Sequence, residues 1–280
     1  MINIFSHFLV WWSKKLVFGL SESDVEFLSV FLCLVFLFIA TVQDVSRTEV
    51  EDYVWDLMIF SGIPLIVLRI FLSDEKKTTF LLITISIVAT FFIALVIFLA
   101  GFWGPADSKA LFSISFLLPL HPSVFIEDKT PFLPFPILAL IYATFLQIFV
   151  PLGLFLINVI KKANFNDVKG TKSQKIALFF MGTPLSIDTF ERRWKYFQCC
   201  EKKKNEEDEE GWQLDLEFEI KELEEDFQEK KEQIKQLKEY KKRQVWVTPT
   251  LPFMLFLLPG FIFAIVFNTK IFELLLNIVK

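Results

Sequence analysis

Two aspartates stand at the edges of long apolar runs, where carboxylates can take part in acid–base chemistry. Asp44 closes an apolar run in ATVQDVSRTEVEDYVW, and Asp107 follows a Gly-Pro break in GFWGPADSKALF. A negative charge at the end of a helix opposes the helix dipole, and ionisable side chains at membrane depth usually have a function. When two carboxylates approach closely, they share one proton. The ionised partner can then activate a water while the protonated partner donates to a carbonyl, which hydrolyses a peptide without metal, serine or cysteine.

Gly104 and Pro105 precede the second aspartate and are expected to start the helix that carries it. Glycine keeps the backbone free of a side chain and proline suits a first helical turn, so the pair breaks the chain just before Asp107. Asp107 fits an N-cap or first-turn position of the helix that follows. A helix from Pro105 to Leu120 spans roughly 24 Å at 1.5 Å per residue, which is short for a bilayer. We therefore expect Asp107 slightly inside the membrane and open to water from one side.

The elements that position these aspartates are predicted from the apolar composition. The chain has 280 residues, of which 54% are hydrophobic and 35 are Phe. Several windows reach the ~18–20 apolar residues that cross a bilayer core of roughly 30 Å. We predict an α-helical polytopic membrane protein with about six transmembrane helices and a small mixed α/β cytoplasmic domain between helices five and six. The predicted spans are residues 25–43, 53–72, 79–101, 106–120, 132–160 and 249–268.

Lysines and arginines set the orientation. They gather at both ends of the polar region between the fifth and sixth spans, so the positive-inside rule predicts that this region is cytoplasmic. The loops 73–78 and 121–131 are then external. Counting spans back from the polar region puts Asp44 and Asp107 at the same, cytoplasmic, membrane face.

Four segments are expected along the chain. They are an N-terminal interfacial extension (1–24), a five-helix membrane catalytic core (25–160), a cytoplasmic domain (161–246), and a sixth transmembrane helix with a C-terminal tail (247–280).

Three patterns indicate how the cytoplasmic domain is built. KIALFFMGTPLSID (175–188) indicates a hairpin, and QLDLEFEI (213–220) alternates with period two, as a strand does. Apolar residues at three- to four-residue spacing indicate an amphipathic helix over 221–243, so the domain combines short strands with that helix. We interpret EKKKNEEDEE (201–210) as a disordered connector.

QDVSRTEVEDYVW followed by GPADSKAL resembles the archaeal preflagellin (prearchaellin) peptidases, which are type IV prepilin peptidase-like membrane aspartyl proteases. Asp44 and Asp107 match the two catalytic aspartates of that family. Gly104 and Lys109 match its G-x-G-D-x-K type motif, and Ala106 stands where the stricter motif has a second glycine. LFFMG and VWVTPTLPFMLFLLPG resemble the family's cytoplasmic region and last span, so the similarity covers most of the chain between its first and sixth predicted spans.

The resemblance implies a membrane aspartyl endopeptidase that removes the short basic leader from archaellin or type IV pilin-like precursors at the cytoplasmic face. Glu49, Glu51 and Asp52 lie in the segment after Asp44 and can meet a basic leader electrostatically. For the two glutamates the alternative is a solvated loop, and for Asp52 it is an N-cap of the second span. Lys109 either orients the carboxylate pair or extends toward lipid headgroups.

No cofactor is implied, and the expected partners are the precursor and the lipid bilayer. A net charge of −4 gives no indication of nucleic acid binding. No metal site is expected, because the three cysteines (Cys33, Cys199 and Cys200) lack metal-ligand spacing.

Two other functions stay open. A transporter or proton relay would also place carboxylates in the membrane, but it predicts paired broken helices, and the chain has one Gly-Pro break before an acid and no internal repeat. A non-catalytic membrane scaffold would act through the 221–243 helix, and both aspartates would then be dispensable. Arg69, near the outer end of the second span, is expected to extend toward the headgroups, and Asp56 is the reserve candidate if Asp44 is inert.

Overall fold

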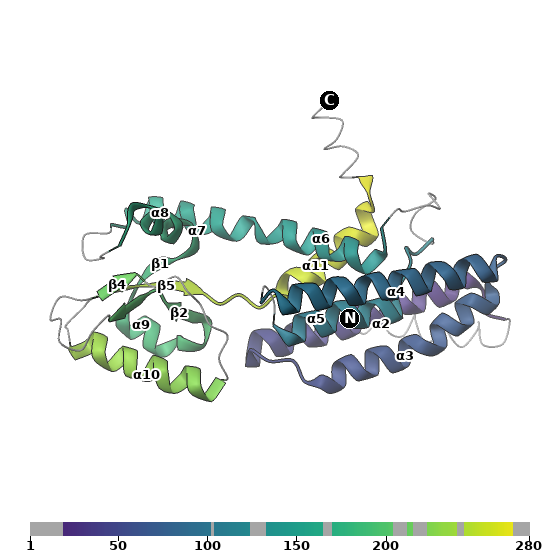
Figure 1. Cartoon of the computed structure of the whole chain (residues 1–280), viewed down its shortest axis with the longest axis horizontal. Helices are drawn as coiled ribbons and strands as arrows, with labels where there is room; N and C mark the ends of the chain where they lie inside the picture. Colours follow the sequence, from purple (N-terminus) through teal and green to yellow (C-terminus); the bar gives the residue numbers. More distant parts are fainter. Residues whose placement is uncertain are drawn as a thin grey trace, which may run out of the picture. The chain divides into compact units, whose positions relative to one another are not determined.

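The computed structural model describes residues 19–101, 104–123, 133–164, 170–203, 212–214, 223–239 and 244–270. The chain divides into two compact units, coloured along the sequence in Figure 1. Unit 1 comprises Met1–Thr144 and Phe253–Lys280, and unit 2 comprises Phe145–Pro252. Most of the predicted N-terminal extension and all but the first residues after the sixth span lie outside the described residues.

Unit 1 is helical. It contains α2 (Glu22–Arg47), α3 (Asp52–Leu72), α4 (Lys76–Leu99), α5 (Pro105–Leu117), α6 (Phe135–Gln147) and α11 (Met254–Phe267). The long helix α2 begins with a capping box, in which the Ser21 backbone N–H donates to the Asp24 carboxylate at 3.0 Å. It ends at Thr48, whose φ of 62° is a left-handed cap that turns the chain toward α3.

Four helical stretches are long and apolar enough to cross a membrane within the described residues: α2, α3, α4 and the continuous run Phe135–Ile160. Each of the six predicted spans coincides with helix, but α5 and α11 have only 13 and 14 residues. The protein is therefore a multi-pass membrane protein, whereas the number of six spans stays a prediction.

The helices of unit 1 pack closely around a buried apolar core and turn large side chains outward. A Cβ at Gly62 of α3 would lie 2.6 Å from the Phe116 carbonyl oxygen of α5, so these backbones touch. Phe60, Phe71 and Leu99 are 70%, 68% and 73% exposed, which is the arrangement that lipid requires of an outer helical surface.

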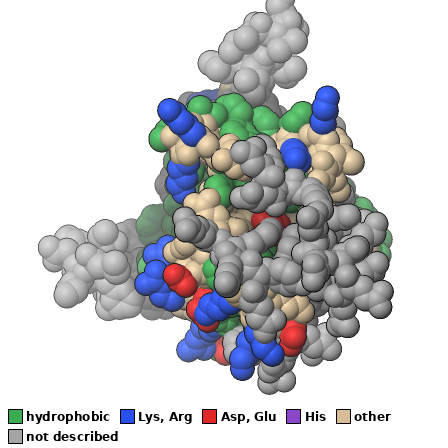
Figure 2. Space-filling view, turned by 90° about the vertical axis from the view of Figure 1, so that its left-hand side faces the viewer, with side chains coloured by type: hydrophobic (Ala, Val, Ile, Leu, Met, Phe, Trp, Pro, Cys, Tyr) green, Lys and Arg blue, Asp and Glu red, His purple; other side chains and the backbone are tan. Residues whose placement is uncertain are grey.

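Unit 2 contains the second part of the membrane-length run Phe135–Ile160 and a small mixed domain. Its helices are α7 (Phe149–Ile160), α8 (Lys172–Met181), α9 (Ile187–Arg192), η1 (Trp194–Tyr196) and α10 (Leu223–Glu239). Its strands are β1 (Thr183–Ser186), β2 (Phe197–Cys199), β3 (Glu201–Lys203), β4 (Trp212–Leu214) and β5 (Gln244–Pro249). The antiparallel sheet has the order β1-β5-β2, and β3 pairs with β4 separately. In the lower part of Figure 2, Lys and Arg side chains lie beside Asp and Glu side chains.

The predicted 175–188 hairpin is wrong. Residues up to Met181 belong to α8, and β1 pairs with β5, where Thr183 stands opposite Val247. Thr171 and Gln174 form a capping box that starts α8, so a local helix signal outweighs the strand-like apolar runs.

Three further predictions for the domain have mixed outcomes. The predicted amphipathic helix is confirmed over α10, where Ile234 and Leu237 are buried. The predicted connector 201–210 is wrong at its start, because its first three residues form β3, and its remaining residues lie outside the described ones. Of the predicted strand 213–220, residues 213 and 214 belong to β4 and the rest lie outside the described residues.

Candidate active site

Asp44 and Asp107 lie at the same end of unit 1, close enough for their charges to interact. Asp44 stands in the last turn of α2, and Asp107 is the third residue of α5. Both side chains are half-buried. The structure therefore brings two carboxylates of like charge within electrostatic range of each other, which makes it costly to ionise both.

The start of α5 fixes Asp107. Gly104 is the N-cap and Pro105 the first residue of the helix, so Asp107 occupies the first turn as the sequence indicated. The Gly104 backbone amide hydrogen-bonds to the Asp107 carboxylate. Asp107 Oδ2 lies 3.8 Å from the place that a Cβ on Gly104 would take. Ala106, half-buried between them in sequence, completes a small-residue turn beside the acid.

The start of α11 fixes Asp44. The Met254 backbone N–H donates to Asp44 Oδ2 at 3.3 Å, and Met254 is the first residue of α11. Thr41, one turn earlier on α2, donates to the Met254 carbonyl oxygen at 3.2 Å and so fastens the two helices together. The negative charge at the end of α2 thus faces the positive end of another helix dipole. Sequence reasoning missed this contact because 210 residues separate its members.

Lys109 does not neutralise the aspartate pair. Its Nζ donates to Asp52 Oδ1 at 2.6 Å, which links the start of α5 to the start of α3. Asp52 is the first residue of α3 and Glu51 is the N-cap, so the predicted N-cap role of Asp52 is wrong by one position. The ion pair, with side chains 49% and 72% exposed, also replaces the predicted extension of Lys109 toward headgroups. The reserve candidate Asp56 is exposed on α3.

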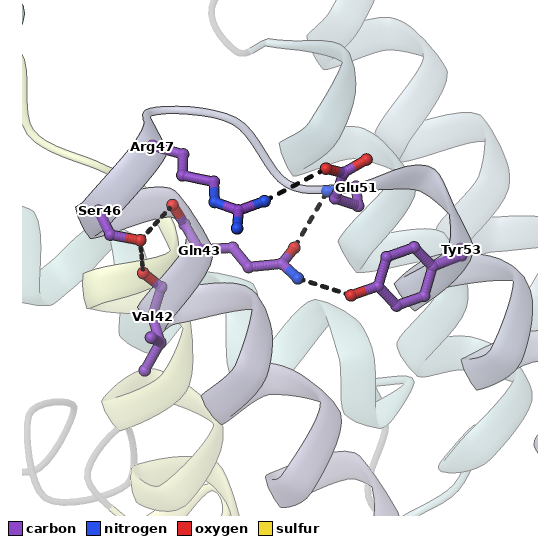
Figure 3. A network of polar contacts seen from close by, with 6 residues as sticks. All are labelled: Val42, Gln43, Ser46, Arg47, Glu51 and Tyr53. Carbon is purple, nitrogen blue, oxygen red and sulfur yellow. Dashed lines mark hydrogen bonds and ion pairs between the residues drawn. The ribbon is translucent and has the colours of Figure 1, made fainter.

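A polar network fastens the loop that follows Asp44 (Figure 3). Gln43 points away from α2, donating from Nε2 to the Tyr53 hydroxyl at 2.9 Å and accepting from the Glu51 backbone N–H at 3.1 Å. Arg47 pairs with the Glu51 carboxylate at 3.4 Å. Glu49 is exposed and makes no hydrogen bond or ion pair within the described part of the chain. Of the two loop glutamates, Glu49 therefore carries the uncompensated charge.

Within the described residues, no three or more His, Cys, Asp or Glu side chains gather as a metal site would require. Cys33 and Cys200 are buried thiols, and Cys199 is half-buried.

A second charged cluster lies at the opposite ends of α2 and α3. Arg69 is only 7% exposed and forms an ion pair with Glu26, which is 1% exposed. Arg69 also donates to the His121 carbonyl oxygen at 3.3 Å, and the Ser123 hydroxyl donates to Glu26 at 2.7 Å. Arg69 therefore does not extend toward headgroups, because Glu26 offers a buried opposite charge. Burial, with a smaller contribution from Arg69, lowers the pKa of His121 to about 4.

The fold and the site together define the class: a multi-pass membrane protein that brings two aspartates from separate helices to one end of its helical unit. Comparison with known families narrows the class. Residues 31–157 match the type IV leader peptidase family, and residues 174–268 match the archaeal peptidase A24 C-terminus, type II. Both matches support the resemblance that the motifs of the chain indicated.

Three curated relatives are preflagellin peptidases. The preflagellin peptidase of Methanocaldococcus jannaschii is 29% identical over 157 residues, covering 54% of this chain and 64% of the relative. That of Methanococcus maripaludis is 28% identical over 160 residues, covering 54% and 66%. That of Methanococcus voltae is 27% identical over 250 residues, covering 86% and 95%. The chain thus matches just under two thirds of the length of the first two relatives.

Proposed function

We propose that this protein is a membrane aspartyl endopeptidase that removes the short basic leader from archaellin or type IV pilin-like precursors. The observation that carries the proposal is the interaction of Asp44 with Asp107 inside the segment that matches the leader peptidase family. The relatives' description as preflagellin peptidases supports the class of substrate.

The surroundings of the two acids suggest different roles. Asp44 receives the Met254 N–H at the start of α11, and both this hydrogen bond and the helix dipole favour its ionised form. Asp107 lies beside that charge, where holding the shared proton avoids two adjacent negative charges. We therefore assign Asp44 as the general base and Asp107 as the general acid.

The reaction then runs in two proton-balanced steps. Asp44 takes a proton from water as the water oxygen bonds to the scissile carbonyl carbon, and Asp107 gives its proton to the carbonyl oxygen. In the second step Asp44 passes its proton to the amide nitrogen as the C–N bond breaks, and one hydroxyl proton of the intermediate returns to Asp107. The leader leaves with a new carboxyl group, and both aspartates regain their starting states.

Two features of the substrate, its basic leader and its hydrophobic helix, bring it to the site. The exposed Glu49 beside the site attracts the basic leader, and the hydrophobic helix after the cleavage point stays in the membrane. The positive-inside rule favours a cytoplasmic location for the polar part of unit 2, because lysines gather in that part of the sequence, and span counting favours the same face for both aspartates.

The test is processing of a prearchaellin and a prepilin by membranes that contain wild-type protein, Asp44→Asn or Asp107→Asn. Each single substitution is expected to lower the rate by at least ~10²–10³-fold, the usual contribution of a general acid or base. Asp56→Asn is the matched control, since Asp56 is exposed on α3. Unchanged processing by both variants would overturn the proposal and leave the scaffold hypothesis, and cleavage of one precursor alone identifies the preferred substrate.

A further inference from the structure

Helix α8 carries an apolar face that stays largely exposed among the described residues of unit 2. Ile176, Phe180 and Met181 are 63%, 37% and 42% exposed, and the first two stand one helical turn apart. The opposite side of α8 is properly packed, because Leu178 is fully buried against Leu214 and Trp246. Helix α8 therefore has two apolar faces, one packed inside unit 2 and one exposed.

The same helix lies against α7. The rings of Phe155 and Phe180 stack with their centroids 4.8 Å apart, and Phe155 meets Phe179 edge-on at 5.6 Å. Figure 1 shows α7 and α8 together in unit 2, and hydrophobic side chains gather at their height in Figure 2, flanked by Lys and Arg.

A buried asparagine fastens this contact. Asn158 of α7 is 0% exposed, and its Nδ2 donates to the carbonyl oxygens of Phe179 at 2.9 Å and Gly182 at 2.7 Å. A polar side chain in an apolar span is costly unless it is satisfied. Here it satisfies carbonyl groups at the end of α8, which fixes that end of α8 to the span.

The contact sets the depth of α8. The apolar run Phe135–Ile160 ends where Lys161 and Lys162 begin. Phe155 lies five residues before that end, or roughly 7 Å along a helix. The end of α8 that packs on Phe155 and Asn158 is therefore inside the apolar boundary that α7 defines. Lys172, at the other end of α8, is exposed.

We infer that α8 is an interfacial helix that seats its Ile176, Phe180 and Met181 face among the lipid acyl chains beside α7. The lipid is the occupant that the observations favour, because this face continues the surface of a helix that is itself covered by lipid. Lys172 and Lys175 reach the phosphate headgroups from the first turn of α8, the usual arrangement of an amphipathic surface helix. The polar domain is thereby anchored to the membrane at a second point, a role that does not depend on the proposed peptidase activity.

The test is the depth of spin labels in the full chain, reconstituted in vesicles of phosphatidylcholine and phosphatidylglycerol. Labels are placed at Ile176→Cys and Phe180→Cys in a Cys199→Ser background, since Cys33 and Cys200 are fully buried. Val159→Cys on α7 is the lipid reference and Lys235→Cys on α10 the water reference, both at exposed positions. Collisions with oxygen, which dissolves in lipid, are compared with collisions with a water-soluble nickel chelate.

At residues 176 and 180 we expect oxygen collisions to dominate, as at Val159 and in contrast to Lys235. Nickel collisions equal to those at Lys235 would overturn the inference, because the face would then lie in water. Shielding from both reagents would also overturn it, because protein, either another part of the chain or a second copy, would then cover the face.

Discussion

The same two helices carry charges at both ends, and the two ends are built in opposite ways. At one end, Arg69 of α3 and Glu26 of α2 form a buried ion pair of opposite charge. At the other end, Asp44 of α2 faces Asp107, a second acid, and the nearby cation Lys109 is bound to Asp52 instead. The ends lie roughly 27 Å apart along α2 at 1.5 Å per residue.

The two ends differ in what their charged residues do: one pair stabilises the fold, and the other is suited to catalysis. An opposite pair in an apolar setting holds helices together, because losing either member leaves the other buried and alone. A like pair gives no such holding force, and it persists only if something else stabilises it. Here that support comes from the start of α11 at Asp44 and from the Gly104 turn at Asp107. The end that costs stability is therefore the end where we place the chemistry.

The largest effect on stability is expected at the paired end, by which we mean the end that holds the Arg69–Glu26 ion pair. Arg69→Met should lower the free energy of unfolding by about 3–5 kcal/mol, because the buried Glu26 loses the arginine with which it forms an ion pair. The double variant Arg69→Met with Glu26→Gln should recover most of that loss. Thermal unfolding in detergent measures both, with Asp44→Asn as the contrasting variant that should leave the melting temperature unchanged or raised. A wild-type melting temperature in Arg69→Met would show that the pair does not lock the helices.

A smaller loss is expected where α3 and α5 touch between the two ends. Gly62→Ala places a Cβ 2.6 Å from the Phe116 carbonyl oxygen, so the helix backbones must move apart. Overpacking of this kind costs about 1–3 kcal/mol. It should also slow precursor processing, because α5 carries Asp107. Gly153→Ala is the matched control on α7, since a Cβ there meets nothing within 4 Å. Equal unfolding curves for the two variants would contradict the close packing.

The paired end should also sense pH through His121. Its folded pKa of about 4 lies below the usual value of about 6.5, so the unfolded chain binds the proton more readily. The stability that depends on neutral His121 is complete above about pH 6.5 and is lost as the pH falls toward 4, with about 2 kcal/mol gone by pH 5. His121→Gln, measured by unfolding at pH 7 and pH 5, should lose less between these values than wild type. Equal losses would rule out His121 as the source.

The smallest effect is expected in the loop beside the like-charged end. Glu49→Gln should raise the KM for a precursor with a basic leader by about two- to fivefold, as a solvated charge contributes about 1 kcal/mol or less. Glu51→Gln should change KM less, because Arg47 already compensates Glu51. The difference should shrink in high salt. A larger effect from Glu51 than from Glu49 would contradict the proposed leader contact.

The sequence predicts the local parts of this picture well. Apolar length located the helices, and the Gly-Pro break placed Asp107 in the first turn of α5. Span counting predicts that both aspartates lie at one membrane face, and the structure places them at the same end of unit 1, where their charges interact. These features depend on neighbouring residues and on alternation across a membrane, which a single sequence carries.

Contacts between residues far apart in the sequence were not predicted. The Arg69 partner is 43 residues away and the Asp44 partner 210, and neither helix contains a local signal for the other. The hairpin prediction failed because β1 pairs with β5 rather than with its neighbour in sequence. Such pairings follow from how whole elements pack, so residue patterns alone could not reveal them.

The most direct test of the central claim is a double-mutant cycle on precursor cleavage, with Asp44→Asn, Asp107→Asn and both together in reconstituted vesicles. Groups that share one proton act as a unit, so each single variant should lose nearly all activity and the double variant should lose no more. A double variant whose loss is the product of the two single losses, or an Asp44→Asn variant within about tenfold of wild type, would contradict a shared catalytic proton.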